Sequence, residues 1–344
     1  MQKENKKMKN RYKILTLCIL ILAGGLQTIY AQQKLAQTGM KFLLVSPDAR
    51  AASMGDAVSA LEGDVSSLFF NPAGLARQSA FYDVSLGQVK WIADINYYYG
   101  AASFAPFSGN YGVVGLSMVY VDYGDFLGTI RANNDAGYID MGIFNPKAYY
   151  FGLTYSKALN DKFSIGGNLK YAVQDLKSSV TAVDVNSGNY TRKDYTPNVL
   201  VFDFGMLYHT GFQSLSFGAV VRNFSKEMKL EAEGFQLPLI FKVGVAYNAA
   251  DLFKLDKNEH SIQLAVEAVH PRDFAEQINT GIEYKFMNML SLRAGYSTPN
   301  DEHNLTAGIG FQKTIADFNL GIDYAYVPWT TFSNVHNFTI HFGF

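Results

Sequence analysis

The sequence has almost no cysteine, little charge and no long apolar run, and each absence excludes a class of protein. Its one cysteine, Cys18, lies in a segment that we expect to be removed. The mature chain then has no thiol for a disulfide, a nucleophile or a cysteine-ligated metal. Lysine and arginine (29) balance aspartate and glutamate (30), which gives no reason to expect nucleic acid as a partner. Beyond residue 31, no run approaches the ~18 apolar residues of a membrane-spanning helix.

Residues 1–31 have the pattern of a secretory signal peptide. Six basic residues between Lys3 and Lys13 precede the apolar run Ile14–Leu26, which is too short to span a bilayer as a helix. Ala31 supplies a small residue at the expected cleavage point, and the alternative is a permanent anchor. The residues just before Cys18 lack the small residue of a lipidation site, so we expect no attached lipid.

Aromatic residues and glycine are abundant where charge is scarce. The chain has 22 Tyr, 26 Phe and 30 Gly, and only 17% of its residues are charged. This composition suits strands that face lipid on one side. From about residue 81 onward, apolar and polar residues alternate. In 318–326, for example, aromatic and aliphatic residues at even positions alternate with Asn319, Gly321 and Asp323.

These alternating runs predict an all-β fold, a transmembrane antiparallel β-barrel of about 14 strands over residues 81–344. The expected strands are 81–91, 95–105, 111–121, 147–158, 162–175, 198–209, 213–223, 238–248, 260–270, 276–286, 289–297, 303–313, 316–326 and 335–344. A soluble sandwich would also alternate. The barrel is favoured by apolar faces that end in Tyr or Phe, by an aromatic C-terminus at Phe344, and by connections that alternate between short and long. We therefore expect the outer membrane of a Gram-negative bacterium, with both termini in the periplasm.

Residues 32–80 differ from the rest and are expected to form a plug in the barrel. Within them, 42–76 is rich in small residues and has turn signals at Ser46-Pro47-Asp48 and at Asn71-Pro72-Ala73-Gly74. The spacing of apolar residues in 48–60 is compatible with a helix. The alternative is an amphipathic lead-in on the barrel rim. The candidate plug residues are Ser46, Pro47, Asp48, Arg50, Gly55, Asp56, Asn71, Pro72 and Ala73.

These motifs resemble the PorV/PorQ family of outer-membrane proteins, which in turn look like relatives of FadL-type transporters. The motif resemblance covers about residues 39–76. It implies a non-enzymatic barrel of the type IX secretion system. PorV-like members bind the C-terminal domains of secreted cargo, and PorQ-like members act in the surface attachment complex. The alternatives are a FadL-like transporter of hydrophobic small molecules, whose plug would move, and a structural barrel with no transport role.

Two further groups of residues are candidate sites. The loop 224–237 is more apolar than a free outer loop needs to be, and it contains Met228, Leu230, Phe235 and Leu237. These residues pack onto the barrel mouth or contact a protein partner or hydrophobic ligand. The second group is the set of charges expected to face the lumen, including Lys170, Asp203, Lys242, Glu267, Glu283, Lys285, Arg293 and Asp323. We expect structural pairing among them.

No catalytic constellation, metal site or cofactor site is predicted. The six histidines are scattered over different strands and loops without ligand spacing. The barrel is expected to contact outer-membrane lipid and no nucleic acid. The family resemblance implies secreted cargo or attachment-complex proteins as partners, and the transporter alternative implies a hydrophobic ligand.

Overall fold

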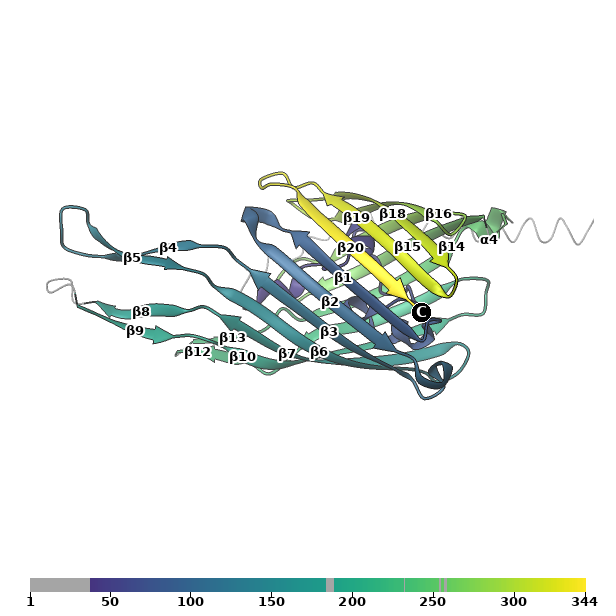
Figure 1. Cartoon of the computed structure of the whole chain (residues 1–344), viewed down its shortest axis with the longest axis horizontal. Helices are drawn as coiled ribbons and strands as arrows, with labels where there is room; N and C mark the ends of the chain where they lie inside the picture. The colour runs from purple at the N-terminus through teal and green to yellow at the C-terminus, as the bar shows by residue number, and fades with distance from the viewer. Residues whose placement is uncertain (1–37, 184–188, 232, 254, 257–258) are drawn as a thin grey trace, which may run out of the picture. The chain divides into compact units, whose positions relative to one another are not determined.

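A computed structural model describes residues 38–183, 189–231, 233–253, 255–256 and 259–344. Within these ranges, fourteen antiparallel strands form one closed barrel (Figure 1). The barrel strands are β1 (Tyr82–Lys90), β2 (Asn96–Phe104), β3 (Val113–Asp122), β6 (Lys147–Ala158), β7 (Phe163–Asp175), β10 (Asn198–His209), β11 (Ser216–Phe224), β14 (Ile240–Asn248), β15 (His260–Pro271), β16 (Gln277–Phe286), β17 (Leu290–Thr298), β18 (Leu305–Ile315), β19 (Phe318–Val327) and β20 (Val335–Gly343). The barrel closes where β1 pairs with β20, from Asp83↔Gly343 to Lys90↔His336.

The predicted barrel is confirmed, and its strand bounds differ from the expected ones by at most three residues. Burial alternates along the strands, as it does in β17, where every second residue is buried. Apolar residues such as Leu116 and Ile322 lie on the exposed face, and charged residues such as Glu283 lie on the buried face. Because lipid offers no hydrogen bonds to a strand edge, closure satisfies the backbone of every barrel strand.

The two ends of the barrel differ. At the end that we call the turn end, connections are mostly short, and both ends of the barrel chain meet there through hydrogen bonds between the backbones of Tyr82 and Phe344. The opposite end, the hairpin end, carries three two-stranded hairpins. Their strands are β4 (Phe126–Arg131) with β5 (Tyr138–Phe144), β8 (Ser178–Val183) with β9 (Tyr190–Asp194), and β12 (Met228–Leu230) with β13 (Glu233–Phe235).

These hairpins were not predicted, because the sequence there reads as loop. The loops 122–146, 176–197 and 224–237 contain them. Their strands are short, and β4 and β5 are each interrupted by a glycine, Gly128 and Gly142. Gly142 lies at φ 83°, next to a register shift between the two strands. A bulge of this kind disturbs the alternation on which a strand prediction depends.

Helices in the described residues are short, and none is long and apolar enough to cross a bilayer. Their bounds are η1 (Lys41–Leu44), α2 (Ala49–Ser53), α3 (Ser67–Phe70), η2 (Pro72–Arg77), η3 (Ile92–Asp94), η4 (Pro106–Gly109) and α4 (Ala250–Phe253). The prediction of a helix over 48–60 is wrong beyond Ser53, where α2 ends. Gly55 (φ 62°) and Asp56 (φ 59°) adopt left-handed conformations that end it. The signal peptide expected at 1–31 lies outside the described residues.

Candidate functional site in the barrel lumen

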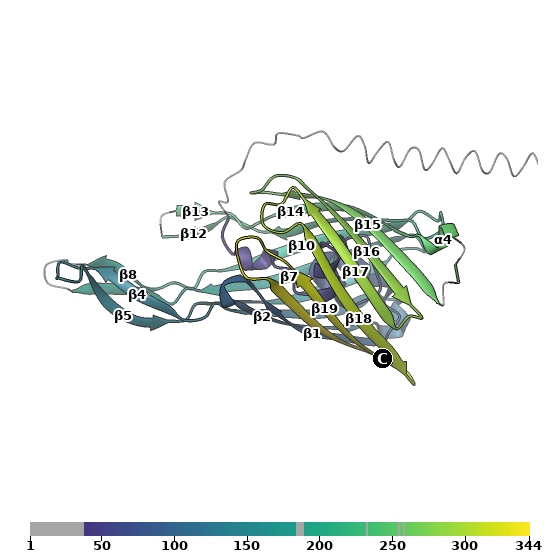
Figure 2. The same cartoon turned by 90° about the horizontal axis from the view of Figure 1, so that it is seen from above.

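Residues 38–80, which we call the inner segment, lie inside the barrel (Figure 2). Their backbone approaches inward-facing glycines on strands all round the wall. A Cβ on Gly166 of β7 would lie 2.5 Å from the carbonyl carbon of Pro72, and one on Gly281 of β16 would lie 2.6 Å from the Met54 oxygen. A Cβ on Gly218 of β11 would overlap the Ser59 carbonyl. Any side chain at these positions would displace the inner segment.

The inner segment runs from the hairpin end to the turn end, so its first described residues lie at the opposite end of the barrel from Phe344. The expectation that both ends of the chain lie on one side of the membrane is therefore wrong for the start of the described chain. Near its start, the Gly39 N–H donates to the Gln236 carbonyl (3.0 Å) beside β13. Near its end, Arg77 donates to the Asn160 carbonyl (2.7 Å) in the turn between β6 and β7. At the same end Glu62 pairs with His209 (2.9 Å).

Asn71 connects two parts of the inner segment to the wall. Its side chain is 1% exposed. The amide nitrogen donates to the carbonyls of Ser59 (2.6 Å) and Met206 (3.1 Å), and its oxygen accepts from the Ala73 N–H (3.1 Å). Pro72 then begins η2, where a missing N–H costs nothing. The Asn-Pro-Ala sequence therefore acts here as a buried helix cap.

Asp48 has the same capping role at α2. Its carboxylate accepts from the Ala51 N–H (3.0 Å) and from the Ser66 hydroxyl (2.9 Å). Just before it, the Ser46 carbonyl accepts from Asn337 of β20 (3.0 Å), and Pro47 is buried. Both turn signals found in the sequence thus cap short helices packed against the wall.

Arg50 links the inner segment to the wall by charge. Its guanidinium lies 2.7 Å from Asp64 of the inner segment and 2.9 Å from Glu283 of β16. On the wall, Arg293 lies 2.6 Å from Glu283 and 2.5 Å from Asp323. Opposite charges therefore alternate from Asp64 through Arg50, Glu283 and Arg293 to Asp323. His341 extends this set, 3.4 Å from Asp323 and 3.7 Å from Asp48.

Four of the other predicted inward charges, Lys170, Asp203, Lys242 and Glu267, are also buried and paired. Lys285 is only partly buried, and the pairing expected of it stays a prediction. Lys170 lies 2.8 Å from Asp203, and Lys242 lies 2.7 Å from Glu267. The Lys242 ammonium also donates to the Asp56 carbonyl (3.3 Å). The Gly55 N–H donates to Thr306 (3.2 Å). These contacts hold the turn after α2 between β14 and β18.

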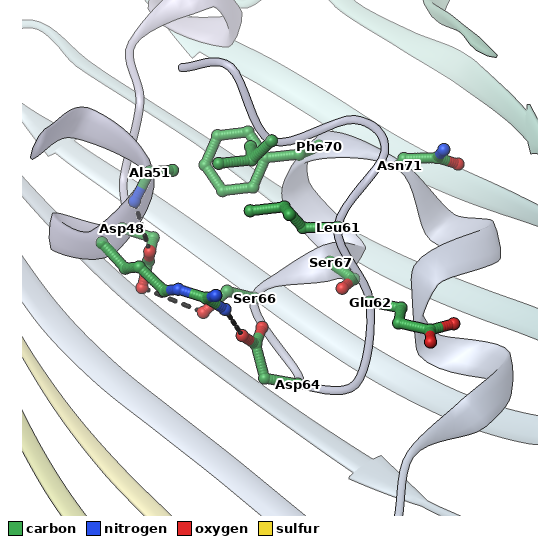
Figure 3. A pocket seen from close by; sticks show the side chains of 11 residues that line it. Asp48, Ala51, Leu61, Glu62, Asp64, Ser66, Ser67, Phe70 and Asn71 are labelled. Carbon is green, nitrogen blue, oxygen red and sulfur yellow. Dashed lines mark hydrogen bonds and ion pairs between the residues drawn. The ribbon is translucent and has the colours of Figure 1, made fainter. Parts of the chain in front are cut away.

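A small pocket lies within the inner segment (Figure 3). The polar groups of Asp48, Ser66 and Asp64 lie on one side of it, and Leu61 and Phe70 lie on the other. Its volume is about 20 Å³, which is room for one water molecule. In the described part of the chain, no group of three His, Cys, Asp or Glu residues could hold a metal ion.

At the hairpin end, the four candidate contact residues of loop 224–237 differ in burial. Leu237 is 0% and Met228 is 7% exposed, whereas Leu230 and Phe235 are partly buried. Phe235 packs against Gly39, and Lys41 forms an ion pair with Asp273 beyond β15. The loop therefore packs onto the start of the inner segment, and its contact with a partner stays a prediction.

Two comparisons with known protein sequences bear on this chain. A family model described as type IX secretion system protein PorV matches residues 28–249, more than half of the chain. The chain belongs to the PorV family. No curated protein matches it in a sequence comparison.

The solved structures similar to this PorV-family chain share its fold. The toluene transporter TbuX of Ralstonia pickettii has a TM-score of 0.55 at 11% identity, over 86% of this chain and 97% of that one. The toluene transporter TodX of Pseudomonas putida has 0.53 at 10% identity, over 91% and 98%. A FadL homologue of Pseudomonas aeruginosa has 0.52 at 11% identity, over 86% and 96%. With the family match, this fold identifies a non-enzymatic outer-membrane barrel of a Gram-negative bacterium.

Sequence reasoning missed the inward glycines of the wall. The alternation by itself only assigns a glycine to the polar side of its strand. A glycine inside a strand is itself a signal of close backbone approach. Its repetition at inward positions of β7, β10, β11, β16 and β18 could have indicated a second segment against the wall.

Proposed function

We propose that this barrel acts in type IX protein secretion, where it binds exported cargo or the proteins that attach cargo to the cell surface. The family match over residues 28–249 is the observation that carries this proposal. In this role the hairpin end faces outward and is the working surface. Long outer loops and short periplasmic turns are the usual arrangement of such barrels.

In this proposal, the inner segment is a plug that keeps the lumen closed. The close approach of Pro72 and Met54 to wall glycines supports this role. So do the ion pairs of Arg50 with Asp64 and Glu283. A secretion partner that binds cargo from outside requires a sealed membrane rather than an open pore.

The second candidate is a transporter of hydrophobic small molecules. Its support is the fold shared with the two toluene transporters. The pocket in the inner segment, at about 20 Å³, is too small for such a ligand, because ligand pockets begin at roughly 300 Å³. A transporter would therefore need the inner segment to move.

Affinity purification from outer membranes in mild detergent tests the two candidates, with mass spectrometry of bound proteins and lipids. Recovery of exported proteins that share a C-terminal domain supports the secretion role. A barrel recovered without proteins but with an apolar small molecule supports the transporter. Substituting the partly buried Leu230 with Ser, with the exposed Leu252 of α4 as control, tests the predicted partner contact. Equal protein recovery from both variants would exclude that contact.

A further inference from the structure

We infer that the space between hairpins β4–β5 and β8–β9 is a binding site for an extended peptide strand of a protein partner. This inference rests on the proposed function and specifies how a protein is held. It begins with the barrel wall, where β6 and β7 pair continuously from Ala158↔Ser164 to Lys147↔Asp175. Beyond that last pair, the two strands lead into different hairpins.

Above the wall, the two hairpins present facing edges. The strand β5 pairs only with β4, and β8 pairs only with β9, within the described residues. A groove of about 770 Å³ lies between them, lined by both hairpins. We call it the hairpin groove; Figure 1 shows the two hairpins that line it. Unpaired strand edges carry rows of N–H and C=O groups that pair readily with another chain.

The groove suits a peptide strand better than a compact ligand. Backbone groups on two opposed edges are satisfied together only by a chain that runs between them. The strand β5 has seven residues and β8 has six, so the guest segment would be of similar length. Because β5 and β8 continue two antiparallel strands, the guest would run parallel to one edge and antiparallel to the other.

The lining of the groove fits a strand that alternates apolar and polar residues. Ile143, Phe144 and Val180 supply apolar surface. Charges of both signs line the groove as well, because Arg192, Asp194 and the ion pair of Lys177 with Asp175 (2.5 Å) also belong to its lining. Ile143 is 71% exposed, so its side chain is accessible to a guest strand. The Arg192 guanidinium donates to the Met141 carbonyl (3.4 Å), which links β9 to β5.

The energetics also favour a guest strand. An isolated two-stranded hairpin is at best marginally stable in water, whereas three or more strands stabilise one another. A guest between β5 and β8 would join two hairpins into one five-stranded sheet. That sheet would continue the barrel wall through β6 and β7, so the membrane-embedded part would fix its orientation.

Site-specific crosslinking in intact cells tests this inference. A photoreactive phenylalanine analogue replaces Ile143 on one edge or Val180 on the other, and the captured exported proteins are mapped by mass spectrometry. Leu127 of β4 is the matched control, because it pairs with Ile143 and is 66% exposed but does not line the groove. Heat-dependent migration on gels verifies that each variant has a folded barrel.

We expect Ile143 and Val180 to crosslink to the same segment of one partner, about seven residues long. Their yield should be about ten times that from Leu127, which lies one strand spacing further from the guest. Crosslinks from the two edges to different segments, to lipid, or to a second copy of this chain would overturn the inference. If exported proteins co-purify with the native chain but neither edge crosslinks to them, the groove is excluded and the secretion role stands. If no exported protein is recovered by either method, both fail.

Discussion

Replacing Arg50 with methionine should loosen the inner segment and make the barrel conduct ions. Methionine keeps most of the side-chain volume but removes the charge that lies between Asp64 and Glu283. Glu283 keeps its second partner, Arg293, at 2.6 Å. The variant therefore breaks the link between the inner segment and the wall while leaving the wall paired.

The expected size of the effect follows from burial. Removing one partner of a buried ion pair costs about 3–5 kcal/mol. The Arg50 side chain is 21% exposed and Glu283 stays paired, so we expect about 2–3 kcal/mol. At 1.36 kcal/mol for each factor of ten, this raises the displaced population about 30- to 150-fold.

Planar-bilayer recording measures this population as the fraction of time that single barrels conduct. Chymotrypsin gives an independent measure, because Phe69 and Phe70 of the inner segment are buried until it moves. The control is Lys193→Met, which removes the exposed ion pair with Glu231 at the hairpin end. If Arg50→Met conducts no more than this control and resists chymotrypsin equally well, the reasoning is refuted.

Three further outcomes are expected. Gly205→Ala should destabilise the inner segment, because the added Cβ would overlap the Asn71 side-chain oxygen. Gly321→Ala should leave stability unchanged, because its added Cβ would make only ordinary contacts. Thermal unfolding compares the two variants. In the double variant Arg50→Met/Glu283→Gln, the logarithm of the conducting fraction should rise by less than the sum of the two single rises, since both changes break the same ion pair; logarithms that add would contradict the pairing. Burial lowers the pKa of His303, which stacks on Trp329. The loop between β17 and β18 should therefore be fully stabilised above the unfolded-state pKa of about 6.5. It should lose stability as the pH falls through the lower folded-state pKa of His303. Tryptophan emission should follow that loss, and a His303→Phe variant should remove it.

The barrel could be predicted almost completely from the sequence. Its strands have a strict period of two because one face meets lipid and the other meets the lumen, and this constraint acts on every residue. The stretch 318–326 illustrates it, with an alternation that continues to the end of β19. The pairing of inward charges could also be expected, since unpaired charges are costly to bury.

The contacts of the inner segment could not be predicted. The partner of Arg50, Glu283, lies 233 positions further along the chain, and nothing local identifies it. The helix over 48–60 failed for a related reason. Apolar spacing favoured a helix, but the wall requires a turn at Gly55 and Asp56, where the backbone meets Thr306 and Lys242. The hairpins were missed because they lie beyond the membrane, where no lipid enforces alternation.

The path of the inner segment constrains how the barrel is assembled. The segment passes lengthwise through a ring whose last seam, β1 with β20, joins residues near opposite ends of the chain. Once that seam forms, the segment can no longer enter from the side and would have to thread lengthwise into the closed barrel. We therefore expect the strands to gather around a segment already in position, with the seam between β1 and β20 closing last. The inner segment would then serve as a core on which the wall is built.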